Sequence, residues 1–160
     1  MSHHKLPISG HAQRGFTLVE VLVSIVVVAF GLLGVAGLLV KSASLGVSAH
    51  NRTLATQKVY EMVDRMRLNS AGVRDGNYDS LSGAATSIDC STPGVCSAAN
   101  VATYDYYQWT QGLATALSAS ATGTVQANGS GLFTITVIWP EKDFGLANFQ
   151  NQTYTLSVRP

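Results

Sequence analysis

The most prominent pattern in the chain is one uninterrupted apolar stretch near its amino terminus. Between Val21 and Val40 the only polar side chain is that of Ser24. Twenty residues in an α-helix span about 30 Å, the thickness of the hydrocarbon core of a lipid bilayer. The stretch therefore predicts a helix that can cross a membrane. Glu20 stands at the start of this helix, and an acid there is a candidate functional residue because an ionised carboxylate is costly inside a bilayer.

The helical pattern continues beyond the apolar stretch. A broad, mostly apolar face repeats every seven residues, and it is made by Leu45, Ala49, Arg52, Ala55, Val59, Met62, Val63 and Met66. Asn69 and Gly72 then supply helix-stop signals. We expect a single helix from Phe16 to about Leu68, with an apolar first half and an amphipathic second half.

Residues 71–100 show no regular period and contain several glycines and a proline, which predicts a long irregular connection. Asn100 is the expected N-cap of a second helix. The apolar positions of that helix fall on one side and are Tyr106, Trp109, Leu113, Ala116 and Leu117.

After Ala121 the period changes to two. Residues 124–127 and 132–139 flank the turn sequence 128–131, Asn-Gly-Ser-Gly, which predicts a β-hairpin. Pro140 is expected to end the second strand, and a loop to Gln152 leads to a third strand. The side chains expected to face the long helix are those of Phe133, Ile135, Val137 and Trp139, with Tyr154, Leu156 and Val158 defining the third strand. The predicted class is α+β: one long amino-terminal helix packed on a small antiparallel sheet, with a short second helix.

Length and charge limit the possible functions. A chain of 160 residues fits one domain with an appendage. Lys5 and Arg14 precede the apolar stretch, and without them 8 basic residues face 9 acidic ones. Such a nearly neutral chain argues against electrostatic binding of nucleic acid, so no nucleic-acid partner is expected.

The segment before the apolar stretch orients the chain in the membrane. Residues 1–15 carry Lys5, Arg14 and three histidines but no acid, so the positive-inside rule leaves the amino terminus in the cytoplasm. A secretory signal peptide has a shorter apolar region, about 7–15 residues, followed by its cleavage site. Cleavage there would discard Glu20. The junction between Gly15 and Phe16 instead lies at the cytoplasmic edge, before the apolar helix begins. A cut there would follow a residue without a side chain.

The sequence Gly15-Phe16-Thr17-Leu18-Val19-Glu20, followed by about twenty apolar residues, resembles the class III leader of type IV pilins and pseudopilins. The resemblance implies that prepilin peptidase cuts after Gly15 and methylates the new amino terminus at Phe16. It also implies that Glu20 neutralises the terminal amine of a neighbouring subunit in a filament. Two opposite charges buried together cost far less than either alone.

The same resemblance divides the chain into three parts. Residues 1–15 would be the leader, residues 16–40 the transmembrane and filament-core half of the helix, and residues 41–160 the periplasmic headgroup, which includes the amphipathic half 41–69. The protein would lie in the inner membrane as a single-pass protein before assembly and on the pilus at the cell surface afterwards.

The amphipathic half carries a more specific similarity. The sequence Tyr-Glu-Met-Val-Asp-Arg-Met-Arg-Leu-Asn at residues 60–69 is similar to the corresponding region of the PilV-type minor pilins, or type IV pilus modification proteins. This similarity implies a minor pilin of low abundance in an initiation or tip complex that promotes pilus assembly. Its partners would be prepilin peptidase, other minor pilins and the major pilin, the last two through their amino-terminal helices.

Cys90 and Cys96 lie close together in a segment expected to face the periplasm or the exterior. A local disulfide is expected in that oxidising space, and a lone C-x5-C pair is a poor zinc site. The loop is small and lies in mid-chain, so it differs from the large carboxy-terminal disulfide loop of many major pilins. This difference points away from a major structural subunit.

No catalytic pattern is visible in the sequence, and we expect neither enzymatic activity nor a cofactor or metal. His50 is the only histidine after the leader, and Asp75, Asp79 and Asp89 do not have the spacing of a known calcium loop. Two alternatives remain open. A minor pseudopilin of a type II secretion system shares the leader, the glutamate and the fold, and a permanently anchored periplasmic binding module requires Gly15 and Glu20 to be dispensable.

Overall fold

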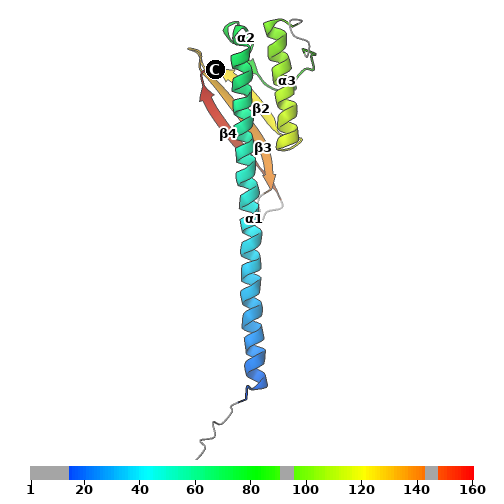
Figure 1. Cartoon of the computed structure of the whole chain (residues 1–160), viewed down its shortest axis with the longest axis vertical. Helices are drawn as coiled ribbons and strands as arrows, with labels where there is room; N and C mark the ends of the chain where they lie inside the picture. Colours follow the sequence, from blue (N-terminus) through cyan, green and yellow to red (C-terminus); the bar gives the residue numbers. More distant parts are fainter. Residues whose placement is uncertain (1–14, 91–95, 143–147) are drawn as a thin grey trace, which may run out of the picture. The chain divides into compact units, whose positions relative to one another are not determined.

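The computed structural model describes residues 15–90, 96–142 and 148–160. The leader before Gly15, the middle of the cysteine segment and part of the expected loop before Gln152 lie outside the described residues. The chain divides into two compact units, residues 1–42 and 43–160. Helix α1 (Leu18–Leu68) contributes its first part to one unit and its second part to the other (Figure 1).

In the first unit, α1 exposes its apolar side chains on all sides. Every described residue from Gly15 to Ser42 is exposed. Among the described residues, α1 is the helix that is long and apolar enough to cross a membrane by length and composition, as the sequence predicts. A helix that is apolar all round is stable only where lipid or other protein covers it.

In the second unit, α1 supplies one wall of a hydrophobic core. Its buried residues are Ala55, Val59, Met62, Val63 and Met66. The helix ends at Leu68, where the stop signals place its end. The predicted apolar face begins too early, however: Leu45, Ala49 and Arg52 are exposed, because no core residue of this unit precedes Ala55.

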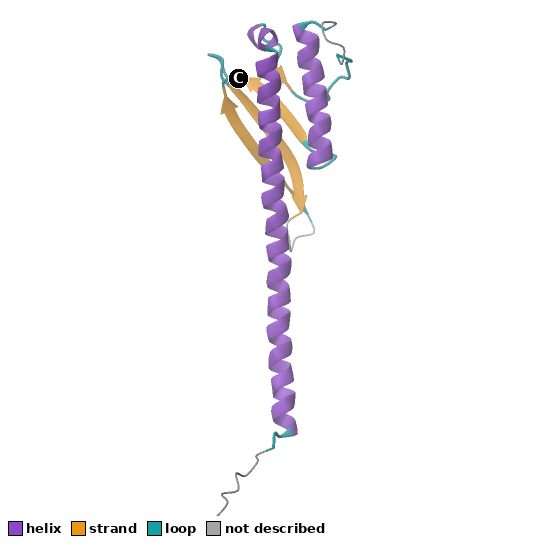
Figure 2. Ribbon diagram, viewed as in Figure 1, coloured by secondary structure: helices purple, strands orange, loops and turns teal. Residues whose placement is uncertain are grey.

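The other wall is an antiparallel sheet of four strands in the order β1-β2-β3-β4 (Figure 2). The strands are β1 (Ser80–Leu81), β2 (Thr122–Ala127), β3 (Phe133–Lys142) and β4 (Phe149–Val158). The predicted hairpin joins β2 to β3. Its turn contains Gly129 and Gly131 with φ of 81° and 72°, a conformation that glycine adopts without steric cost.

Two strand predictions are wrong at their ends. Pro140 does not end β3 but pairs with Asn151, and β4 begins at Phe149 rather than near Gln152. The partner strand β2 reaches only to the Thr122–Ile138 pair, so Pro140 has a neighbouring strand on one side only. A proline, which lacks an N–H group, is tolerated at such a half-open position.

Short elements around the connection were not expected from the sequence. Helix α2 (Ser70–Arg74) follows α1 directly, and the side chain of Asn69 caps it by accepting a hydrogen bond from Gly72 N at 3.2 Å. Strand β1 has two residues, too few to show the alternation of apolar and polar positions that predicts a strand. Asn69 thus both ends α1 and starts α2.

The second predicted helix is α3 (Ala98–Ala116). Its N-cap is Ser97 rather than Asn100: the hydroxyl of Ser97 accepts a hydrogen bond from the backbone N–H of Asn100 at 3.2 Å. The capping residue lies three positions earlier than expected because serine is as good an N-cap as asparagine.

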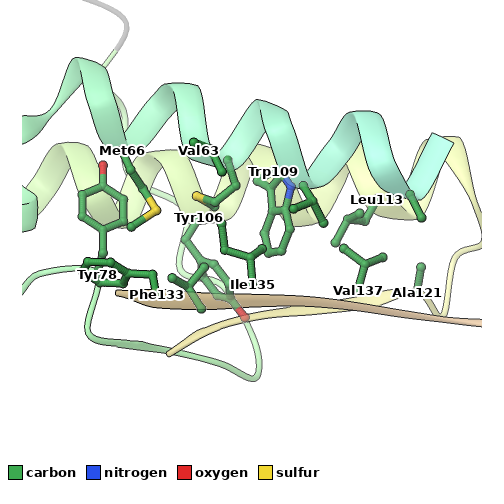
Figure 3. Packing of buried hydrophobic residues seen from close by; sticks show 14 of the residues in the cluster. Val63, Met66, Tyr78, Tyr106, Trp109, Leu113, Ala121, Phe133, Ile135 and Val137 are labelled. Atoms are coloured by element: carbon green, nitrogen blue, oxygen red, sulfur yellow. The ribbon is translucent and has the colours of Figure 1, made fainter. Parts of the chain in front are cut away.

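The core of the second unit lies between α1, α3 and the inner face of the sheet (Figure 3). The predicted inward residues Phe133, Ile135, Val137 and Trp139 are all buried, as are Trp109 and Leu113 of α3. The helices and the sheet each have one apolar face, and packing these faces together buries both. The predicted α+β fold, a long amino-terminal helix on a small antiparallel sheet, is confirmed.

Candidate functional site

The start of α1 is set by a local hydrogen-bond pattern. The hydroxyl oxygen of Thr17 accepts a hydrogen bond from the backbone N–H of Glu20 at 3.2 Å, and the Thr17 carbonyl accepts one from Val21 N at 3.2 Å. Thr-x-x-Glu is the sequence of a helix capping box. The helix therefore begins just after the Gly15–Phe16 junction, and the junction itself lies outside it.

The junction is open on the surface of the chain. Phe16 is 81% exposed, and a Cβ atom placed on Gly15 would have no atom within 4 Å. The chain itself would thus accept a larger residue at this position. The contacts of the described residues therefore do not require glycine at this position.

Glu20 lies in the first turn of α1 and is exposed. The positive end of the helix dipole favours a carboxylate at this place. Ser24 donates its hydroxyl to the backbone oxygen of Glu20 at 2.7 Å, not to the carboxylate. None of the ion pairs among the described residues involves Glu20, so its carboxylate is available to a cation from outside the chain.

A second polar cluster ties α1 to α3. Asp105 is 7% exposed and accepts a hydrogen bond from the Tyr78 hydroxyl at 2.6 Å. It also accepts one from Arg65 Nη1 at 3.3 Å. Glu61 pairs with both Arg65 and Lys58 at 2.8 Å. The cluster thus joins two helices and the connection that follows α2 through charge-assisted hydrogen bonds.

Burial and pairing shift the pKa values in this cluster. Burial pushes the pKa of Glu61 upward, but hydrogen bonds from Lys58 and Arg65 outweigh that effect and lower it. Burial likewise works against the charge of Arg65, but the hydrogen bonds and charges of Glu61 and Asp105 raise its pKa. The pKa of Tyr78 is raised by burial and by its bond to Asp105. The paired charged forms and the neutral phenol are therefore favoured in the folded state.

Sequence reasoning found only part of this cluster. The Glu61–Arg65 pair is visible from its spacing of one helical turn, whereas Asp105 is 40 residues from Arg65. A groove of about 600 Å³ lies beside the cluster, lined by Glu61, Asp64, Arg65, Leu68, Asn69, Cys90, Val101, Tyr104 and Asp105. Among the described residues no group of three or more metal-binding side chains comes together.

The two cysteines that the sequence singles out are joined in the structure. A disulfide links Cys90 to Cys96, six positions apart. Cys90 is one of the residues that line the groove described above. The disulfide-bonded Cys90 therefore lies beside residues of α1 and α3.

One known family model matches the segment around Gly15. Residues 10–36 match the family model described as "Prokaryotic N-terminal methylation motif". No curated protein and no solved structure matches the chain. The matched segment includes the junction at Gly15 and Phe16 and the acid at Glu20, and it supports a class III leader of the type IV pilin kind.

Proposed function

We propose that this chain is a minor pilin of a type IV pilus. Prepilin peptidase cuts after Gly15 and methylates Phe16, and the mature chain is held in the inner membrane until it enters a filament at low abundance. It acts in an initiation or tip complex with other minor pilins. The observation that carries the proposal is the match of residues 10–36 to the methylation motif.

Glu20 supplies the assembly chemistry in this proposal. Cleavage creates an ammonium group at Phe16, and the exposed carboxylate of Glu20 in a neighbouring subunit pairs with it. Both groups leave water together, and their mutual attraction offsets part of the desolvation penalty that either would have if buried alone. The apolar surface of residues 21–40 is then covered by the helices of neighbouring subunits instead of lipid.

Two features favour a minor pilin within this class. The disulfide between Cys90 and Cys96 encloses a small loop in mid-chain, unlike the large carboxy-terminal loop of many major pilins. The sequence at residues 60–69 is similar to that of PilV-type minor pilins. A minor pseudopilin of a type II secretion system is the alternative, because the leader, the glutamate and the fold are common to both.

The first experiment determines the mass and amino-terminal sequence of the protein from membranes of cells with and without prepilin peptidase. We expect a mature chain that begins at methylated Phe16 only where the peptidase is present. In the Gly15→Val variant the leader should remain. Gly37→Val is the matched control, because a Cβ atom at Gly37 also meets nothing within 4 Å, and it should be processed normally.

An unprocessed chain in every strain would contradict the proposal and favour the anchored binding module. If processing occurs, a deletion strain separates the two filament systems. Loss of pili and twitching motility with normal protein secretion supports a minor pilin. Loss of secretion with normal pili identifies a pseudopilin.

A further inference from the structure

The end of β3 is tied to the part of α1 that follows the apolar stretch. Ser48 comes eight residues after Val40, the last residue of that stretch, in the same helix, and eight helical residues rise about 12 Å. The hydroxyl of Ser48 donates a hydrogen bond to Glu141 Oε2 at 3.1 Å, and Asn51 Nδ2 donates one to Glu141 Oε1 at 3.1 Å. The headgroup layer of a bilayer extends about 5–7 Å beyond the hydrocarbon core. The chain therefore keeps the end of β3 within a short distance of any membrane that α1 spans.

Lys142 and Phe149 form the last pair of the β3–β4 ladder. Gln152 of β4 accepts a hydrogen bond from Arg52 at 3.5 Å, whereas Glu141, two pairs further along the ladder, is bonded to the earlier part of α1. Strand β3 thus runs alongside the second part of α1 in the opposite direction (Figure 1). Within the second unit, Lys142 and Phe149 are the described sheet residues nearest to the beginning of its helix, which follows the apolar stretch directly.

Exposed apolar side chains gather at this end of the second unit. Among its described residues the large exposed apolar side chains are those of Leu45, Val47, Tyr60, Leu68 and Phe149. Three of these five lie at this end, and Phe149 is 66% exposed. By the alternation of a strand, Phe149 and Lys142 lie on the face of the sheet that turns away from the core. An exposed aromatic ring beside a lysine is typical of protein surfaces that lie on lipid.

The charge at this end suits the phosphate groups of lipids. Lys142 and Lys41 take part in none of the ion pairs among the described residues. Residues 41–53 and 141–153 together hold three basic residues and two acids, whereas the other residues after Val40 hold five basic residues and six acids. The balance is thus positive at this end and negative over the rest. A positive end is attracted to an anionic phospholipid surface.

We propose that Lys142 and Phe149 bind the surface of the bilayer that α1 spans. The ring of Phe149 lies among the lipid headgroups, and the ammonium group of Lys142 pairs with their phosphates. The occupant is a phospholipid surface because the short distance from Val40 to Ser48 brings this surface close to the end of β3. The contact rests on the membrane anchoring in the proposed function, and it holds the second unit against the membrane before assembly.

The test uses the full chain in vesicles of phosphatidylcholine and phosphatidylglycerol. Bromine atoms on the acyl chains, close to the headgroups, quench tryptophan fluorescence at short range. Phe149→Trp adds a fluorophore at the proposed contact, while the buried Trp109 and Trp139 supply a constant background. Brominated lipid should lower the added fluorescence at least about twofold, because an aromatic ring in the headgroup layer meets the first part of the acyl chains. Leu68→Trp is the matched control, because Leu68 is exposed at the far end of α1, and it should not be quenched.

A second pair of variants tests the charge. Lys142→Gln, made in the Phe149→Trp chain, should lower the ratio of membrane-bound to free second units about fivefold, as expected for one cation at an anionic surface. Arg67→Gln is the matched control, because it removes an exposed cation near the far end of α1, and it should leave the quenching unchanged. Neither readout depends on cleavage at Gly15.

The proposal is overturned if Phe149→Trp is not quenched, if Leu68→Trp is quenched equally, or if Lys142→Gln leaves the ratio unchanged. Phe30→Trp, within the apolar stretch, separates this failure from a failure of anchoring. Quenching of Phe30→Trp without quenching of Phe149→Trp leaves the membrane span intact and overturns the surface contact alone. Quenching of neither variant overturns both.

Discussion

At the scale of single residues, Asp105 is the one buried charged side chain among the described residues. It is a buried carboxylate whose two oxygen atoms accept hydrogen bonds from Tyr78 and Arg65. Its removal leaves the buried hydroxyl of Tyr78 without its acceptor and the guanidinium of Arg65 without one of its two acidic partners. A buried polar group that loses its partner costs more than the net value of the bond it made.

We predict that Asp105→Ala lowers the free energy of unfolding by about 2 kcal/mol. The value is below that of a fully buried ion pair because Arg65 keeps its bond to Glu61 and is partly exposed. Urea unfolding of the full chain in micelles, followed by the fluorescence of buried Trp109 and Trp139, measures the change. Asp64→Ala removes an exposed pair with Arg67 and should change stability by less than about 0.5 kcal/mol. Equal effects of the two variants would contradict the assignment.

The raised pKa of Tyr78 predicts a loss of stability at alkaline pH. Above pH 10, the ordinary pKa of a tyrosine, the phenol ionises in the unfolded chain while it stays neutral in the folded one. The unfolded state then binds fewer protons, so stability falls as pH rises. The Tyr78→Phe variant has no phenol to ionise here. Any excess in unfolding free energy of the native chain over this variant should therefore shrink or reverse above pH 10. A difference that does not vary with pH in this range would refute the prediction.

At the scale of elements, α3 packs closely on β2 because Gly123 has no side chain. A Cβ atom at this position would overlap the Trp109 ring and lie 2.7 Å from Leu113 Cδ1. We predict that Gly123→Ala costs about 1–3 kcal/mol of stability, since both Trp109 and Leu113 are fully buried and must shift to admit the methyl group. Thermal unfolding followed by near-ultraviolet circular dichroism, which detects the packing of Trp109, measures the change.

Gly112 is the matched control for this prediction. A Cβ atom there would meet only the flexible end of Lys58, 2.9 Å away. Alanine also favours a helix by up to about 1 kcal/mol relative to glycine, so Gly112→Ala should be neutral or stabilising. If Gly123→Ala is tolerated as well, the packing of α3 on β2 is looser than the structure shows.

The elements also show what the sequence could and could not predict. The apolar stretch of residues 21–40 predicts the first half of α1 by its length alone, and the helical period from Ala55 to Met66 predicts the buried part of its second half. The alternation in β3 predicts the buried face of the sheet, because burial on one face imposes a period of two. The end of β3 was missed because tolerance of Pro140 depends on where β2 ends. Strand β1 and the partnership of Tyr78 with Asp105 were missed for a related reason: both arise from residues far apart in the sequence, and no local pattern encodes them.

At the scale of the whole molecule, the two units have different sources of stability. The unit of residues 43–160 has its own core of side chains from α1, α3 and the sheet. The unit of residues 1–42 exposes its apolar side chains throughout the described part, so its stability depends on lipid or on neighbouring helices. A substitution near Glu20 can therefore alter assembly without altering the fold of the second unit.

This separation allows the charge of Glu20 to be tested alone. Glu20→Gln removes the charge but keeps the shape of the side chain, and glutamine suits the capping position as well as glutamate does. The ammonium group of the neighbouring subunit would then be buried without a partner, at a cost of several kcal/mol. Each 1.4 kcal/mol lowers the equilibrium constant for incorporation about tenfold. We predict at least about tenfold less protein in sheared filaments, with normal cleavage at Gly15 and unchanged unfolding of the second unit.

The matched control is Glu141→Gln, which changes an acid bonded to Ser48 and Asn51 of its own chain and should leave incorporation unchanged. Native incorporation of the Glu20→Gln variant would show that the carboxylate does not pair with the neighbouring amine.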